Sequence, residues 1–483
     1  MRSGLIQAAY GPLFAGVYAR DLFLRLFGLI FAVAFLSLYS QVLVLYGSEG
    51  LMPAAASLAG GIDWLGRPTI FWLDSSDTTL GVAALAGVIL SFGLVLNLAP
   101  RYCLVACWAL YLSFVSIGAP FLNFQWDNLL LETAVCALFI TPAGWRPKNT
   151  PPPHPAAVFL LQWLLFRLHF ESGVAKLASG DPTWRDLTAM VSYYETAPLP
   201  TWVGWYVHQL PIWAHRLTSG LTLLVELLLP WFIWSPPPLR TVTLIIFLIL
   251  QATVLLTANY TFFNYLTVVL CLFLLDDRQL GRLATRLRLV PAAVRRPAAW
   301  RGVVLIPAVG LMVAVSFLPF LRFLRNLPPE LVGVQRVVDA FRIANAYHLF
   351  ASMTLIRREA VIEGSNDGES WREYEFRYKP GDVMRAPPFV APHQPRVDFQ
   401  LWFLMLGRQW GAPYFDRLIR RLLTAPETVA PLFERMPFGN DPPKFVRTAA
   451  YRYRFTDRQT RRATGAWWQR ELILYSNVQS RRH

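Results

Sequence analysis

The stretch Trp163-Leu-Leu-Phe-Arg-Leu-His-Phe-Glu-Ser-Gly-Val-Ala-Lys-Leu177 has the apolar character of a membrane helix, yet it carries Arg167, His169, Glu171 and Lys176. An ionisable side chain is costly inside a bilayer, so such groups normally face a protein interior or a water-filled cavity. The helix is therefore predicted to turn these four side chains toward other parts of the protein.

The composition of the whole chain is that of a membrane protein. Of its 483 residues, 55% are hydrophobic and only 16% are charged, against about 25% charged in an ordinary soluble domain. A helix needs roughly 17–25 apolar residues to cross the hydrocarbon core. The sequence predicts an all-α polytopic bundle with about nine spans, near residues 22–45, 79–98, 102–118, 126–141, 156–176, 213–234, 239–257, 260–275 and 302–321.

The charges of the loops predict the orientation of this bundle, because Lys and Arg accumulate on the cytoplasmic side. Arg146 and Arg240 lie in even-numbered loops, and the connection 276–301 contains seven arginines. The odd-numbered loop 47–78 has four acidic residues and one arginine. We therefore expect a cytoplasmic amino terminus and an outside location, in the periplasm or the lumen of the endoplasmic reticulum, for everything after about residue 321.

Residues 322–483 form the second predicted domain, after a membrane domain of residues 1–321. Alternating runs on either side of Asn366-Asp367-Gly368 are typical of a β-hairpin with a tight turn. This pattern favours a β-rich α+β domain outside the membrane. A further strand is predicted at 445–455, and helices are predicted at 416–423 and 426–435.

The fifth span is predicted to have two different faces. Lys176 and His169 are seven residues apart and share one face. Arg167 and Glu171 are four residues apart on the opposite face, where they can form a structural ion pair.

Lys176 and His169 are the candidate catalytic residues, because a desolvated lysine can act as a base or a nucleophile. Each has a simpler interpretation. Lys176 can lie at the outer end of its span and extend to the interface, or it can form a structural pair within the membrane. His169 can be a hydrogen-bonded interior residue.

Glu226 is another ionisable residue expected within the membrane. It lies in the sixth span and has no basic neighbour in its own helix. It must therefore be protonated or pair with another helix. The candidate partners are Lys176, Arg25 and Arg167.

Asp127 and Glu132 lie in the fourth span, five residues apart. At this spacing the two carboxylates are only roughly on the same face of a helix. Together with Trp126, they favour an anchor at the membrane interface over a carboxylate pair.

Several classes of mechanism are not supported by the sequence. The four cysteines all lie in predicted spans without a C-x-x-C pair, and common nucleotide-binding, esterase and zinc-protease motifs are absent. We therefore predict no metal and no cofactor. The net charge of +15 does not imply nucleic acid, because topology explains its cytoplasmic part. The outer part can meet anionic membrane lipid or an acidic partner.

Several segments together resemble the lipase maturation factor family, whose members help homodimeric lipases fold. This resemblance implies a non-catalytic membrane folding factor with a client lipase as its partner, bound through residues 322–483. The segments that carry it are Tyr46–Pro53, Phe124–Glu132, Phe166–Leu177 with Trp184–Ala189, Asn259–Asn264 and Pro392–Trp402.

Four residues of the outer domain are candidates for the client surface. They can equally belong to the core of that domain. The four are Trp371, His393, Arg396 and Trp402.

A second, more limited likeness leaves an alternative open. The run Gly173-Val-Ala-Lys-Leu177 looks like part of the membrane domain of vitamin K-dependent carboxylases, in which a lysine at the position of Lys176 is catalytic. The alternative is thus a membrane enzyme that uses Lys176 and His169. The arginine- and alanine-rich composition, and the absence of a retention signal at Arg482-His483, favour a bacterial inner membrane over the endoplasmic reticulum.

Overall fold

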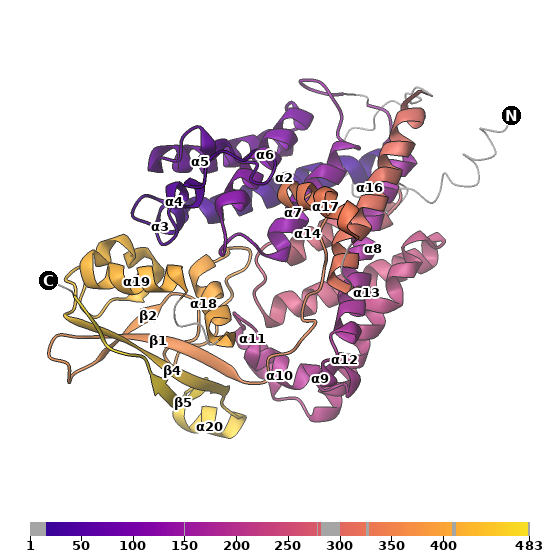
Figure 1. Cartoon of the computed structure of the whole chain (residues 1–483). Coiled ribbons are helices and arrows are strands. Elements are labelled where there is room, and N and C mark those ends of the chain that lie inside the picture. Colours follow the sequence, from indigo (N-terminus) through magenta and orange to yellow (C-terminus); the bar gives the residue numbers. More distant parts are fainter. Residues whose placement is uncertain are drawn as a thin grey trace.

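A computed structural model describes residues 16–148, 150–277, 279–281, 300–324, 328–407 and 412–481 (Figure 1). Most of the arginine-rich connection 276–301 and the terminal Arg482-His483 lie outside the described residues. The chain has a helical amino-terminal region followed by a region with an antiparallel sheet, which confirms the predicted succession of an α and an α+β part.

The helical region is built from apolar sequence interrupted by short turns. Its helices are α2 (Val17–Tyr39), α3 (Val42–Tyr46), α4 (Ala54–Leu58), α5 (Asp77–Val95), α6 (Pro100–Ile117), α7 (Gln125–Leu138), α8 (Pro155–Ala178), α9 (Pro182–Arg185), α10 (Ala189–Thr196), α11 (Trp202–His208), α12 (Ile212–Leu227), α13 (Pro237–Thr257), α14 (Phe263–Leu270), α16 (Trp300–Leu324) and α17 (Pro329–Phe341).

Five of the described helices are long and apolar enough to cross a membrane. They are α2, α5, α6, α13 and the part of α16 from Gly302 to Leu321. The chain is thus an integral, multi-pass membrane protein. All five correspond to predicted spans.

The other four predicted spans are also helical, but each falls short of a simple apolar span. α7 has 14 residues, about 21 Å at 1.5 Å per residue, against about 30 Å of hydrocarbon. α8 has 24 residues but carries the ionisable groups. α12 and α14 are short and continue into 3₁₀ turns at Leu229–Trp234 and Cys271–Leu274.

Small residues allow the first two membrane helices to pack closely. A Cβ atom added to Gly28 of α2 would lie 2.9 Å from the Ser91 carbonyl oxygen of α5. One added to Gly87 would lie 2.4 Å from the Phe35 ring. Close backbone approach through small residues is a common way of packing membrane helices.

The carboxyl-terminal region is an antiparallel sheet in the order β3-β2-β1-β4-β5, with β6 also paired to β4. The predicted hairpin is β1 and β2, which pair with Ile362 opposite Tyr374. The strands are β1 (Arg357–Ser365), β2 (Arg372–Phe376), β3 (Phe433–Arg435), β4 (Phe445–Phe455), β5 (Trp468–Tyr475) and β6 (Gln479–Ser480), with helices α18 (Arg396–Leu406), α19 (Pro413–Thr424) and α20 (Arg458–Thr464).

The helix predicted at 426–435 is wrong. This segment forms two 3₁₀ turns, Pro426–Thr428 and Ala430–Leu432, followed by strand β3. Pro431 has no N–H with which to continue an α-helix. Pro431 therefore prevents a continuous α-helix across this segment.

The sheet region contacts the helical region at one end, as Figure 1 shows. The connections between predicted spans that it contacts include the first, third, fifth and seventh. The fourth connection bonds instead to the start of α2, where Arg20 donates to the Pro151 carbonyl. The contacts of the sheet region with connections include Arg417 with Ser48, Arg396 with Phe121, Arg357 with Pro198, and Pro388 with Asn259.

Candidate functional site

The four ionisable residues of α8 are all buried. Arg167 is 3% exposed, and its Nε donates to Glu171 Oε1 at 2.8 Å. Its Nη1 donates to Glu132 Oε1 of α7 at 2.6 Å. The structure thus brings Arg167 and Glu171 together, as the four-residue spacing predicts, and adds Glu132 to the pair. The expectation that Glu132 is an interfacial anchor is wrong, because its carboxylate is buried against Arg167.

The remaining atoms of this cluster bind the segment that leads from α17 to β1. Glu132 Oε2 accepts from the backbone N–H of Asn345 at 2.8 Å and from the Tyr347 hydroxyl at 2.9 Å. Glu171 Oε2 accepts from the N–H of Tyr347 at 3.0 Å. Arg167 Nη2 donates to the Asn345 carbonyl. These charges therefore attach a later segment of the chain to the membrane helices.

Lys176 is buried and paired. Its Nζ lies 2.7 Å from Glu226 Oε2 of α12 and donates to the Leu349 carbonyl at 2.8 Å. The ammonium also lies 5.2 Å from the centre of the Trp184 ring. The expectation that Lys176 extends to the membrane interface is wrong, because Glu226 and residues after α17 enclose it. Of the three partners considered for Glu226, the structure brings Lys176 to it.

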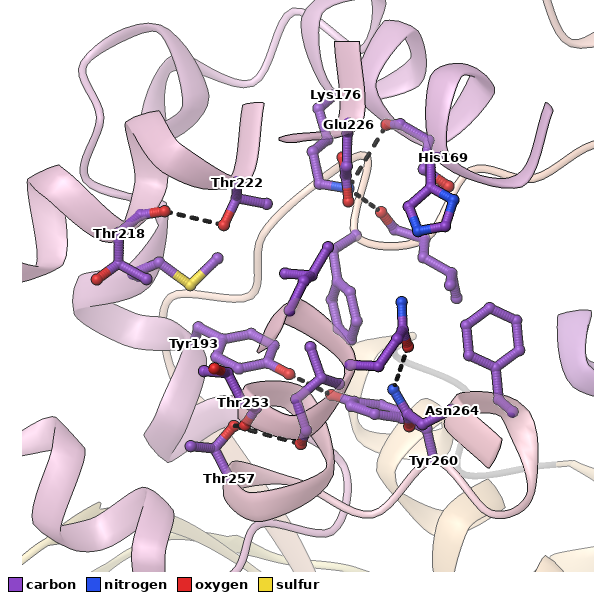
Figure 2. Close-up of a pocket in the computed structure, with 18 of the residues that line it drawn as sticks. His169, Lys176, Tyr193, Thr218, Thr222, Glu226, Thr253, Thr257, Tyr260 and Asn264 are labelled. Carbon is purple, nitrogen blue, oxygen red and sulfur yellow. Dashed lines mark hydrogen bonds and ion pairs between the residues drawn. The ribbon is translucent and has the colours of Figure 1, made fainter. Parts of the chain in front are cut away.

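His169 shares a cavity with Lys176 and Glu226 (Figure 2). Its Nδ1 lies 3.0 Å from the Leu165 carbonyl, and its ring stacks on Phe247 at 4.1 Å between centroids. The two candidate catalytic residues thus line one cavity. No cluster of His, Cys, Asp and Glu that could hold a metal ion occurs among the described residues.

Another buried ion pair joins α7 to α18. The guanidinium of Arg396 donates from Nη1 to Asp127 Oδ2 at 2.7 Å and from Nη2 to Asp127 Oδ1 at 2.8 Å. The Tyr111 hydroxyl donates to Asp127 Oδ1 at 2.6 Å. Because both charges are buried, Asp127 is not an interfacial anchor and Arg396 is not part of an exposed client surface.

Two other predicted client residues also bond to the helical region. His393 Nδ1 lies 2.9 Å from the Ser37 hydroxyl of α2. Burial, with a contribution from the nearby Arg396 charge, lowers the pKa of His393 to about 4. Trp402 is partly buried and its indole N–H donates to the Thr196 carbonyl at 2.9 Å. Both residues therefore help to attach the sheet region.

Trp371 alone of the four candidates lies on the sheet without a bond to the helical region in the described structure. It is partly exposed, and its indole N–H donates to the Gly368 carbonyl at 3.1 Å within its own hairpin. Its ring lies 4.1 Å from the guanidinium carbon of Arg447.

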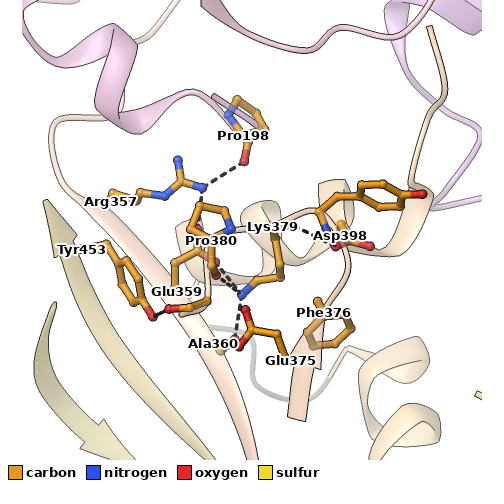
Figure 3. A network of polar contacts seen from close by, with 12 residues as sticks. Pro198, Arg357, Glu359, Ala360, Glu375, Phe376, Lys379, Pro380, Asp398 and Tyr453 are labelled. Carbon is orange, nitrogen blue, oxygen red and sulfur yellow. Dashed lines mark hydrogen bonds and ion pairs between the residues drawn. The ribbon is translucent and has the colours of Figure 1, made fainter. Parts of the chain in front are cut away.

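Sequence reasoning missed a third buried network, which is drawn in Figure 3. Glu359 of β1 pairs with Arg357 at 2.5 Å and with Lys379 at 2.9 Å. Arg357 also donates to the carbonyls of Ala197 and Pro198, at 2.5 and 2.9 Å. The sequence does contain a pattern that indicates this network. Arg357 and Glu359 are two residues apart, which places both charges on one face of a strand.

Asn259 begins the segment Asn259–Asn264, for which the sequence predicted no structural role. Its Oδ1 accepts from the N–H groups of Val390 and Ala391 at 2.7 and 2.9 Å, and its Nδ2 donates to the Pro388 carbonyl at 3.0 Å. A single amide thus fixes an extended segment before α18. Its position in the short polar turn after the predicted span 239–257 is the feature of the sequence that could have indicated this role.

Comparison with known families identifies both regions. The model of the lipase maturation factor transmembrane domain matches residues 18–282, and that of the lipase maturation factor C-terminal domain matches residues 343–476. The chain belongs to the lipase maturation factor family.

Relatives from vertebrates match over nearly the whole chain. Lipase maturation factor 2 of Gallus gallus is 33% identical over 94% of this chain and 80% of its own length. Lipase maturation factor 2 of Homo sapiens is 34% identical over 94% and 81%. Lipase maturation factor 1 of Mus musculus is 32% identical over 94% and 85%. No solved structure matches the chain.

Segments that carry the family resemblance are bonded to one another. Phe124–Glu132 binds Phe166–Leu177 through the Glu132–Arg167 pair, and binds Pro392–Trp402 through the Asp127–Arg396 pair. Asn259–Asn264 binds Pro392–Trp402 through a hydrogen bond from the Thr261 hydroxyl to the Pro392 carbonyl at 3.1 Å. In this chain these motifs form the attachment between the two regions.

The Asp127–Arg396 attachment gives a testable prediction. Asp127→Asn leaves a buried guanidinium without a counter-charge, which costs about 3–5 kcal/mol for pairs of this kind. We expect a clear loss of thermal stability in detergent, and partial recovery when Arg396→Gln is added. Asp441→Asn, at an exposed position, is the control and should be close to the unmodified protein. Strictly additive losses in the double variant would contradict the pairing.

Proposed function

We propose that this protein is a membrane-anchored maturation factor that assists the folding and assembly of secreted or membrane-associated clients, by resemblance homodimeric lipases. It acts through residues 322–483, which present a surface to the client. Family membership supports the lipase as client class. The exposed edge of the sheet is the observation that carries the proposal.

Strand β5 forms this edge. It pairs with β4 on one side, and no other described strand pairs with its outer side. Its last four residues, Leu472 to Tyr475, are 42–46% exposed. Because successive side chains of a strand point to opposite faces, both faces are apolar here. An open apolar edge is suited to receive an extended segment of a partly folded client by strand addition.

An aromatic and cationic cluster adjoins the edge. Arg447 of β4 lies between two rings, with its guanidinium carbon 4.1 Å from the Trp371 ring and 3.9 Å from the Tyr475 ring. Its Nε donates to Glu363 at 2.6 Å. Trp, Tyr and Arg dominate the energetics of protein interfaces. This cluster, together with β5, is the proposed client surface.

The contacts of Lys176 favour a folding factor over the carboxylase-like alternative. A catalytic lysine must present its amine to a substrate. Here the amine is instead held by the Glu226 carboxylate of α12 and by the Leu349 carbonyl, so its contacts are those of a structural ion pair within the protein.

We also propose the finer membrane arrangement: nine spans in residues 1–321, a cytoplasmic amino terminus, and residues 322–483 outside, in a bacterial inner membrane. The contacts of the sheet region with odd-numbered connections support a single side for it. An impermeant thiol reagent, added to cells with any outer membrane permeabilised, should label Ser370→Cys and leave Trp145→Cys unlabelled. Labelling of Trp145→Cys alone would invert the orientation.

The client surface gives a further prediction. Leu472→Lys combined with Leu474→Lys places charge on the open edge without removing a buried group. Because a few residues carry most of the energy of an interface, we expect a loss of lipase maturation on the order of ten-fold. The measurement is the activity of a co-expressed homodimeric lipase at matched protein levels.

The matched control is Leu355→Lys, at a position that is 61% exposed and outside the sheet. It should retain full activity. Full activity in the β5 variant would show that this edge is not the client surface. If co-expression of the unmodified protein does not raise the activity of the lipase, the lipase assignment would be contradicted instead.

A further inference from the structure

The cavity beside α8 has the composition of a binding site for an amphiphile. Its volume is about 110 Å³, where one water molecule needs roughly 10–15 Å³ on this measure. Most of its wall is apolar, from Leu168, Leu250, Val254, Phe263 and Phe350. Its polar groups include His169, Lys176, Glu226 and Asn264, which Figure 2 labels. Polar side chains set in a wall whose surface is mostly apolar are typical of ligand sites.

Two buried acceptors of this cavity have no hydrogen-bond partner among the described residues. A carbonyl can only accept, so His169 Nδ1 carries the proton in its bond to Leu165. In the neutral ring, Nε2 is then an acceptor, and it has no partner among the described residues although His169 is only 3% exposed. The Oδ1 atom of Asn264 is a second buried acceptor without a described partner.

Two of the donors nearby are already engaged, whereas the buried indole N–H of Trp126, which also lines the cavity, has no partner among the described residues. Lys176 Nζ donates to Glu226, to the Leu349 carbonyl and, at 3.5 Å, to the Ser172 carbonyl. Asn264 Nδ2 donates to Gln251 Oε1 at 2.8 Å. A ligand that brings hydroxyl groups therefore fits these acceptors. A carboxylate or phosphate headgroup would have to displace Glu226 from Lys176.

The cavity also reaches the side of the molecule that faces lipid. Thr222 of α12 and Thr253 of α13 both line it, and Thr253 is exposed. Leu221 and Leu224 of α12 and Ile249 of α13 are exposed beside them, at 47–59%. An acyl chain lying in the cavity thus has an apolar path between α12 and α13 to the bilayer.

We propose that this cavity binds a neutral, hydroxyl-bearing lipid of the monoacylglycerol or diacylglycerol class, taken from the bilayer between α12 and α13. A hydroxyl of the glycerol group donates to His169 Nε2, and the acyl chain lies along the apolar wall. The site is formed in part by Leu349 and Phe350, which follow α17. The proposal does not depend on the identity of the client.

Two photoreactive probes with the same diazirine acyl chain test the proposal. One is a monoacylglycerol and the other is the methyl ester, which has no hydroxyl. With the full-length protein in nanodiscs, we expect the monoacylglycerol to label α8, α12 and α13 about five-fold more than the ester, as one net hydrogen bond allows. Equal labelling by the two probes, or absence of labelling, would overturn the proposal.

Variants locate the labelling in the cavity. Leu250→Trp fills it and should abolish the labelling, as should Thr253→Trp at its lipid-facing side if the first variant is unstable. Ile245→Trp, on the exposed side of the same helix, is the control and should retain it. His169→Phe keeps the ring and removes the acceptor, so the two probes should become equivalent.

Two further labelling results would contradict the proposed lipid site. Labelling that persists in both filled variants would mean ordinary contact with surrounding lipid and would overturn the site. Stronger labelling by a fatty-acid probe of the same chain would replace the proposed headgroup by an anion at Lys176. Thermal unfolding of each variant confirms that it is folded.

Discussion

Buried charges in the membrane helices are the constraint on which the rest of the structure depends. A guanidinium among apolar helices needs compensating charge, and Arg167 has it from Glu132 and Glu171. Two carboxylates around one cation leave oxygen atoms that still need donors. Asn345 and Tyr347 supply them. The helical region is therefore completed electrostatically by residues far along the chain.

This arrangement fixes the sheet region relative to the membrane helices. The Asp127–Arg396 pair, the amide of Asn259 and the contacts of Arg357 hold it at separate points along one end of the helices. The open strand β5 belongs to the same sheet as the attached strand β1. A client bound at the edge proposed above would thus be held in a defined orientation to the membrane helices.

Local patterns predicted local structure well. The spacing of Arg167 and Glu171 predicted their contact, and Asn366-Asp367-Gly368 predicted the β1–β2 hairpin. Local patterns could not predict contacts between residues that are distant in sequence. Arg396, for example, lies 269 residues from its partner Asp127. Lys176 was placed at the interface because its own helix offers no covering group. The hydropathy of α8 alone cannot show that Glu226 of α12 and the backbone at Leu349 enclose Lys176.

The segments after α17 and before α18 are bonded into the buried core of the helical region, and the rest of the structure depends on this attachment. Hydrogen exchange in nanodiscs tests this attachment most directly, on peptides that cover residues 343–349 and 388–393. We expect protection close to that of α7 and α8, because the N–H groups of Asn345, Tyr347 and Val390 donate to buried side chains. Exchange as fast as that of the exposed loop at 439–441 would contradict it.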